Sequence, residues 1–162
     1  MDFKTKSEIF TDINRIDTII KTDIFNKENY GHPLKESAFI DLIIKLRDLL
    51  YKSEELGKRI DFKEDIVLKN SVEDITDAVI YIRDAACHIH SRNHILIKNI
   101  VFTFNVVYGK GNMISIPGIS PTSDYDDDVC FFYGEQKLYL KRHITRAFNE
   151  AKEFLKPFLY PI

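Results

Sequence analysis

Apolar residues recur every three or four positions in three long stretches of the chain, which is the spacing of one buried face of a helix. The first stretch, at residues 7–22, carries isoleucines at positions 9, 13, 16 and 20. The second, at residues 34–57, follows a segment rich in Asn, Gly and Pro at residues 26–33, which is typical of a loop. The third runs from residue 71 to about residue 91. These patterns predict three amphipathic helices.

Residues suited to helix ends stand next to these three stretches. Thr5 or Ser7 can cap the first helix with a side-chain oxygen, and Gly57 is a natural stop for the second. Ser71, with an acidic residue three positions on, resembles a capping box at the start of the third. Residues 58–71 show no clear period, so a short helix and an extended connector both remain open for them.

The pattern changes from helical to alternating in the second half of the chain. Residues 100–108 are rich in β-branched and aromatic side chains, which predicts a strand. A glycine-rich turn then precedes a predicted return strand at residues 113–116, so we expect a hairpin. Residues 129–133 can add a further strand, and from about Gln136 a last helix is expected to run to Pro157.

The composition indicates a single domain over residues 1–162. The chain is 44 % hydrophobic and contains 12 Phe and 8 Tyr, which supply enough apolar surface for one core. The expected fold is mainly α, a bundle of four or five helices. A β-hairpin or small sheet is inserted at about residues 100–133, before the C-terminal helix.

Charge and cysteine content narrow the classes of function and the expected compartment. Lys and Arg total 23 against 25 Asp and Glu, a net charge of −2, so any nucleic-acid site must be local. Cys87 and Cys130 have no CxxC spacing and are expected to be reduced thiols in the cytoplasm. The N-terminus lacks the apolar core of a signal peptide, and no stretch of about 18 apolar residues is present. We therefore expect neither secretion by that route nor a membrane span.

The densest set of reactive side chains lies near the end of the third predicted helix, and its members are Arg83, Asp84, His88 and His90. At about 100° per residue, Asp84 and His88 share one face of a helix, and the other two residues share another. Asp84 can orient the His88 ring, while Arg83 presents a permanent cation suited to a phosphate. A base near neutral pKa and a phosphate-binding cation are the parts needed to cleave RNA without a metal.

The segment RDAACH at residues 83–88 resembles the R-x(4–6)-H motif of the HEPN superfamily. By position, Arg83 matches the motif Arg, Asp84 the polar residue that follows it, and His88 the motif His. The longer version of the motif also permits His90. The resemblance implies a helical bundle that forms a homodimer with two motifs at the interface. It further implies a metal-independent endoribonuclease without a cofactor, of a toxin–antitoxin or antiviral defence system, where an antitoxin or another protein is the partner.

The β segment departs from a plain helical bundle, so a decorated HEPN domain and a different fold both remain open. Basic residues also gather near the start of the last predicted helix. Lys137, Lys141, Arg142 and Arg146 lie on its outer side, and together with Arg92 they could guide an RNA backbone. An ordinary charged surface is the alternative interpretation of these five residues.

Other functions and sites are also compatible with parts of the sequence. A non-catalytic HEPN-like dimer could bind RNA, a nucleotide or a protein partner, and a purely structural helical domain could carry the Arg and His incidentally. Cys87, His90 and His94 lack the spacing of a zinc site, so we expect no metal, and Cys87 is expected to be a small buried residue. Residues 124–128 are acidic but Val129 stands where a calcium loop needs Gly, which favours a solvated loop.

Overall fold

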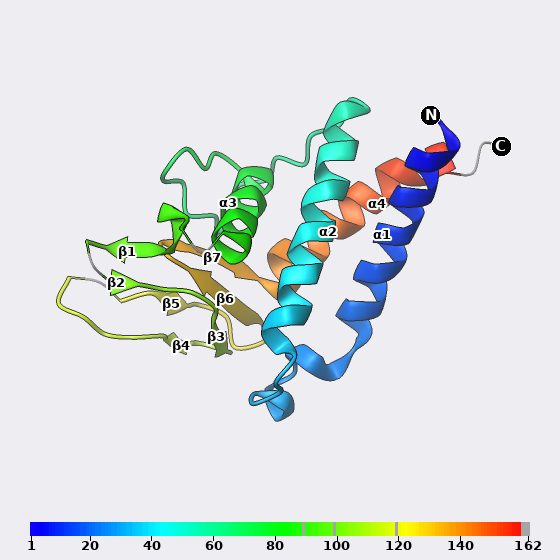
Figure 1. Ribbon diagram of the computed structural model, residues 1–162. Coiled ribbons are helices and arrows are strands. Elements are labelled where there is room, and N and C mark those ends of the chain that lie inside the picture. The colour runs from blue at the N-terminus through cyan, green and yellow to red at the C-terminus, as the bar shows by residue number, and fades with distance from the viewer. Residues whose placement is uncertain (89, 99, 119, 160–162) are drawn as a thin grey trace.

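The computed structural model describes residues 1–88, 90–98, 100–118 and 120–159 and shows a mixed α/β fold (Figure 1). It is 53 % helical, with four α-helices and a region of small antiparallel sheets. The prediction of a mainly α protein is therefore wrong. The expected order of helices, β segment and C-terminal helix is confirmed, but the β segment reaches from residue 95 to residue 139 rather than from 100 to 133. Within the described residues, no helix is both long and apolar enough to cross a membrane.

The first two helices lie close to their predicted positions. Helix α1 (Phe3–Lys21) begins before the predicted cap, because the Asp2 side chain accepts a hydrogen bond from the Thr5 amide at 2.8 Å. Thr5 and Ser7 are thus inside the helix, and neither caps it. Helix α2 (Lys35–Glu55) ends as predicted. Gly57 follows it with φ +103°, a backbone conformation that glycine adopts without strain.

Helix α3 (Ile75–Cys87) is shorter than predicted at both ends. Asp74 is its N-cap and accepts a hydrogen bond from the Asp77 amide at 3.0 Å, so the predicted cap at Ser71 is wrong. Ser71 has φ +67°, outside the helical region. Residues 58–71 form neither a helix nor a strand, but Arg59 in this connector pairs with carboxylates at the end of α2 and the start of α3. Ile89, in the predicted continuation of α3, lies outside the described residues.

The strands are short, and most of the pairings differ from the predicted hairpin. A three-stranded antiparallel sheet has the order β3 (Asn105–Tyr108), β6 (Val129–Tyr133) and β7 (Gln136–Tyr139). Two small antiparallel pairs lie beside it: β1 (Ile95–Ile97) with β2 (Ile100–Val101), and β4 (Gly111–Asn112) with β5 (Thr122–Ser123).

Three predictions about this β segment are corrected. Residues 100–108 are two strands instead of one, and residues 113–116 form no strand. The partner of β3 is β6, where Val106 faces Phe131 in the register. Gln136 begins a strand and not the last helix, because β6 and β7 form a tight hairpin at residues 134–135. The helix starts only after it, with a π-helical turn (Leu140–Thr145) that leads into α4 (Arg146–Leu159). Exposed Pro157 lies inside α4 and does not end it.

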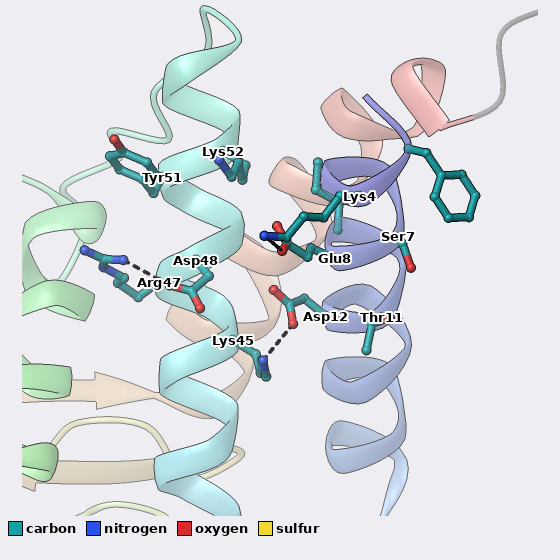
Figure 2. Close-up of a pocket in the computed structure, with 12 residues that line it drawn as sticks. Lys4, Ser7, Glu8, Thr11, Asp12, Lys45, Arg47, Asp48, Tyr51 and Lys52 are labelled. Carbon is teal, nitrogen blue, oxygen red and sulfur yellow. Dashed lines mark hydrogen bonds and ion pairs between the residues drawn. The ribbon is translucent and has the colours of Figure 1, made fainter. Parts of the chain in front are cut away.

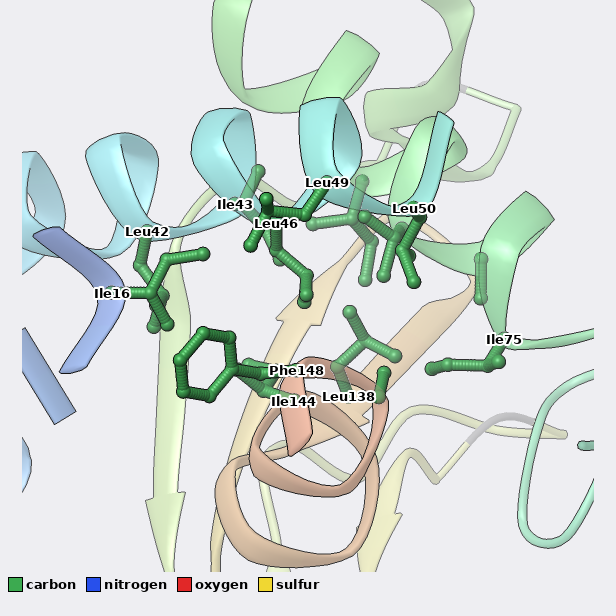
Figure 3. Close-up of a cluster of buried hydrophobic side chains, with 14 of the residues drawn as sticks. Ile16, Leu42, Ile43, Leu46, Leu49, Leu50, Ile75, Leu138, Ile144 and Phe148 are labelled. Carbon is green, nitrogen blue, oxygen red and sulfur yellow. The ribbon is translucent and has the colours of Figure 1, made fainter. Parts of the chain in front are cut away.

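Helix α2 is at the centre of the fold, in contact with α1, α3 and α4 (Figure 1). Successive side chains of a strand point to opposite sides of the sheet, and in the three-stranded sheet both sides are apolar. Phe131 and Leu138 belong to the face that packs against the helices, where the rings of Phe39 and Phe131 lie 4.4 Å apart. Figure 3 shows side chains of α2 meeting Leu138 and Phe148 in this main core. The opposite face carries a smaller cluster made of Cys130, Phe132 and Tyr139.

Candidate functional site

The end of α3 brings Arg83, Asp84 and His88 into one contact network. The Arg83 Nη1 atom lies 2.9 Å from Asp84 Oδ1 and 3.2 Å from His88 Nε2. His88 is the C-cap residue of α3, with φ −123° and ψ 103°, and its amide still donates to the Asp84 carbonyl at 3.1 Å. The chain leaves the helix at this point, and the extended backbone of His88 lets its ring turn back to the guanidinium.

The contacts within this network differ from the predicted ones. The sequence placed His88 on the helix, one turn after Asp84, where the carboxylate would orient the ring. His88 lies beyond the last helical residue, and Arg83 makes the contact to the ring. A guanidinium only donates, so His88 Nε2 is the acceptor in this contact. Arg83 therefore orients the His88 ring through Nε2.

Arg83 has an incompletely satisfied guanidinium. Its side chain is 31 % exposed, yet its Nε atom is buried and has no hydrogen-bond partner among the described residues. A buried N–H without an acceptor is unfavourable, and such groups are often found where a ligand supplies the missing acceptor. Asp84 is 43 % exposed and His88 is exposed, so the network is open to solvent.

The segment after His88 is held against α3 by side-chain contacts. The His94 ring is buried and contacts the Ala85 carbonyl through Nε2, and Asn93 Nδ2 donates to the Tyr81 carbonyl at 3.2 Å. His90 and Arg92 are exposed on this segment, so both predicted site residues lie outside α3. Arg92 lines a hollow of about 420 Å³ together with Tyr81, Asn93 and Glu135.

Of the five basic residues predicted to bind RNA, Arg92 is exposed, and the other four contact acidic side chains or a backbone carbonyl. Lys137 lies on β7 and not on the last helix, and its Nζ atom is 2.7 Å from Asp124. Arg142 pairs with Asp127 at 2.8 Å and with Asp128 at 3.1 Å. The remaining two also have acceptors: Lys141 donates to the Asp127 carbonyl, and Arg146 pairs with Glu150 and Glu64. A phosphate would have to compete with these contacts.

The acidic segment 124–128 is tied to the folded chain and is not a fully solvated loop. The Asp128 side chain is fully buried and accepts hydrogen bonds from the amides of Lys141 and Arg142 at 2.9 and 3.1 Å. It thereby caps the start of the π-helical turn from a distance of 13 residues in the chain. The hydrogen bond from Lys137 lowers the pKa of Asp124.

His143, which was not among the predicted site residues, lies in the π-helical turn and is 1 % exposed. Its Nδ1 atom accepts from the Tyr139 amide at 3.2 Å, and its Nε2 atom lies 3.0 Å from the Glu64 carbonyl, to which it donates. Burial lowers the pKa of His143 to about 4. Because both ring nitrogens are occupied by the backbone, His143 holds the connector against the sheet and is not poised for proton transfer.

A groove of about 750 Å³ lies between α1 and α2 (Figure 2). Its charged side chains face one another: Lys45 is 3.0 Å from Asp12, and Arg47 is 3.0 Å from Asp48. Burial raises the pKa of Asp12. These charges compensate one another within the groove, so it offers no reactive set comparable to the one at the end of α3.

Within the ranges that the structure describes, no group of three or more His, Cys, Asp or Glu side chains is arranged to hold a metal. Cys87 is partly exposed, contrary to the prediction of a buried residue, whereas Cys130 is buried.

Comparisons with known proteins gave no match: no protein family, no curated protein and no solved structure matches this chain.

Proposed function

We propose that the protein is a metal-independent endoribonuclease of the HEPN type, with Arg83 and His88 as its catalytic residues. The contact of 3.2 Å between Arg83 Nη1 and His88 Nε2 carries the proposal, because it pairs a phosphate-binding cation with an imidazole on an open surface. The buried Arg83 Nε atom, which has no acceptor in the part of the chain that the structure describes, supports it further. The role of a toxin or antiviral defence effector follows from the HEPN resemblance, and the cytoplasmic location from the cysteine content.

The proposed reaction uses the groups of this network in sequence. A phosphate of RNA draws the Arg83 guanidinium toward its oxygens, which releases His88 Nε2 from its contact with Arg83. His88 then takes the proton of the 2′-hydroxyl while the 2′-oxygen bonds to phosphorus and the bond to the 5′-oxygen breaks. Arg83 stabilises the charge on the phosphate oxygens. The products are a 2′,3′-cyclic phosphate and a 5′-hydroxyl.

A second histidine is needed to give a proton to the leaving 5′-oxygen. In the proposed homodimer, two copies of the four-helix, HEPN-like arrangement bring both Arg83–His88 pairs into one cleft, so that His88 of the second copy is the acid. His90 is exposed two residues further on and is the alternative donor. Asp84, 2.9 Å from Arg83, positions the guanidinium.

The test is cleavage of mixed single-stranded RNA by the purified protein in EDTA, with Arg83→Ala and His88→Ala at equal concentration. We expect the wild type to produce 2′,3′-cyclic phosphate ends and each variant to lose at least about 100-fold in rate. Arg47→Ala is a matched control, since Arg47 forms the same pair with its sequence neighbour Asp48, at 3.0 Å, without a histidine. Intact RNA with the wild type, or full activity of His88→Ala, would refute the catalytic proposal.

A non-catalytic HEPN-like dimer that binds RNA, a nucleotide or a protein partner is the second candidate. One observation favours it: His88 Nε2, the atom that would act as the base, is occupied by Arg83. This candidate predicts that the wild type retains labelled RNA in a mobility-shift assay but leaves it uncut. Loss of retention in Arg83→Ala, with retention in Arg47→Ala, would then assign Arg83 to binding alone.

A further inference from the structure

A buried lysine at the start of α2 has no acidic partner. Lys35 is only 4 % exposed, and none of the carboxylates that the structure describes lies within 4.0 Å of its amine. Other partly buried lysines do pair with an acid: the distance is 3.0 Å for Lys45 and 2.6 Å for Lys152. An unpaired buried charge is costly, so an anionic ligand at this amine would be strongly favoured.

The groups that contact the Lys35 amine are neutral. Its Nζ atom donates to the Tyr30 carbonyl at 2.7 Å and to the Tyr108 hydroxyl, and it lies 4.9 Å from the centre of the Tyr108 ring. Burial raises the pKa of Tyr108, so the phenol keeps its proton and does not serve as a counter-ion. Burial also lowers the pKa of Lys35. These contacts hold the amine in place without neutralising it.

Several donors at this position are free to bind an oxyanion. An ammonium has three N–H groups, and two of those of Lys35 are used. The Tyr108 hydroxyl accepts from Lys35, and its own proton has no acceptor among the described residues. Helix α2 has 21 residues and no side-chain cap at its N-terminus, so its first amides and its dipole add to the positive potential.

Lys35 is one of the residues that line an open groove of about 720 Å³. Tyr30, Phe104 and Val106 give this groove apolar and aromatic walls, and Lys27 adds a second cation. Glu36 also lines it but is exposed and makes no ion pair with Lys35. The groove thus combines a fixed cation with walls that suit the body of an organic molecule.

We propose that this groove binds a phosphate monoester with an aromatic or apolar body, whose phosphate accepts hydrogen bonds from Lys35 and Tyr108. The phosphate supplies the missing counter-ion and an acceptor for each free donor. The proposal is independent of RNA cleavage, because it uses none of the residues at the end of α3.

The test is calorimetric titration of the full chain with phenyl phosphate, alongside phenol as a probe that lacks the charge. We expect saturable binding of phenyl phosphate and none of phenol. Lys35→Met, which keeps the aliphatic stem, should weaken binding roughly tenfold or more, and Tyr108→Phe about fivefold. Lys27→Met removes the exposed second cation of the same groove and should weaken binding less than Lys35→Met does. Glu36→Gln should strengthen binding.

If Lys35→Met does not fold, Tyr108→Phe still tests the proposal, because this variant retains the lysine. Binding of phenyl phosphate to the wild type and to Tyr108→Phe is then compared by phosphorus NMR. Absence of binding by the wild type, equal binding of phenol, or an unchanged affinity in Tyr108→Phe and Lys35→Met would overturn the proposal. Arg83→Ala should bind phenyl phosphate as the wild type does, so this site and the ribonuclease proposal stand or fall separately.

Discussion

Replacing Gly134 by Ala should destabilise the protein strongly, because this glycine lies in a narrow space at the turn between β6 and β7. Its φ is +53°, and its amide donates to the Phe102 carbonyl at 3.0 Å. A Cβ atom at this position would lie 2.1 Å from the Asn93 carbonyl oxygen and 3.2 Å from that of Ile95. The neighbouring backbone, and not a flexible side chain, would have to move.

The expected magnitude has two parts. A left-handed conformation costs an L-residue about 1–2 kcal/mol. Relief of the 2.1 Å contact must also shift the backbone at Asn93, which loosens the hydrogen bond from Asn93 to Tyr81 and the contact of His94 with Ala85. Hydrogen bonds of this kind contribute about 1 kcal/mol each. We therefore expect the free energy of unfolding to fall by about 3 kcal/mol.

Urea denaturation followed by circular dichroism measures this change, and two glycine variants separate its parts. Gly57→Ala has a positive φ of +103° but no atom within 4 Å, so it should lose only the conformational part. Gly31→Ala has neither a positive φ nor a close atom and should stay within about 0.5 kcal/mol of the wild type. If Gly134→Ala is no less stable than Gly57→Ala, the steric argument is wrong.

Two further predictions concern buried titratable groups. Burial lowers the pKa of His143 from 6.5 to about 4. Between these pH values the unfolded chain binds a proton that the folded protein does not, so the free energy of unfolding falls as the pH drops from 6.5 to 4. The free energy of unfolding should decrease by about 2 kcal/mol from pH 7 to pH 5, and His143→Gln should remove that part of the slope. Burial raises the pKa of Cys130 to about 12, so its thiol should not react with iodoacetamide at pH 8 until the protein unfolds, whereas partly exposed Cys87 should be labelled. Peptide mass spectrometry would show which cysteine carries the label.

The sequence alone was sufficient to predict the position of α1 and α2 and the general order of helices and strands. A periodic apolar face is a local property, and Ile9, Ile13 and Ile16 of α1 and the leucines of α2 are buried as their spacing indicates, while Ile20 is only partly buried. Strand pairing is not local. The aromatic residues 100–108 indicated β structure, but their partner β6 lies more than 20 residues further on, beyond a nearer candidate at residues 113–116.

The candidate site was predictable in its residues and not in its geometry. The spacing of Arg83 and His88 singled out the end of α3, but only the folded chain shows that α3 stops at Cys87 and that His88 turns back to Arg83. Residues 93–94, which follow the helix, also contact the backbone of α3, and no local pattern reveals these contacts.

What the sequence by itself determined is the set of amphipathic helices and the kinds of side chain available, because both depend on neighbouring residues. Only the tertiary structure decided which charges are neutralised. Arg142 meets Asp128 across 14 residues, whereas Lys35 is buried against Tyr108, 73 residues away, without an acid. Charges are buried and paired through contacts between distant parts of the chain. From the sequence alone, Lys35 could therefore lie on a solvated surface or in a binding site.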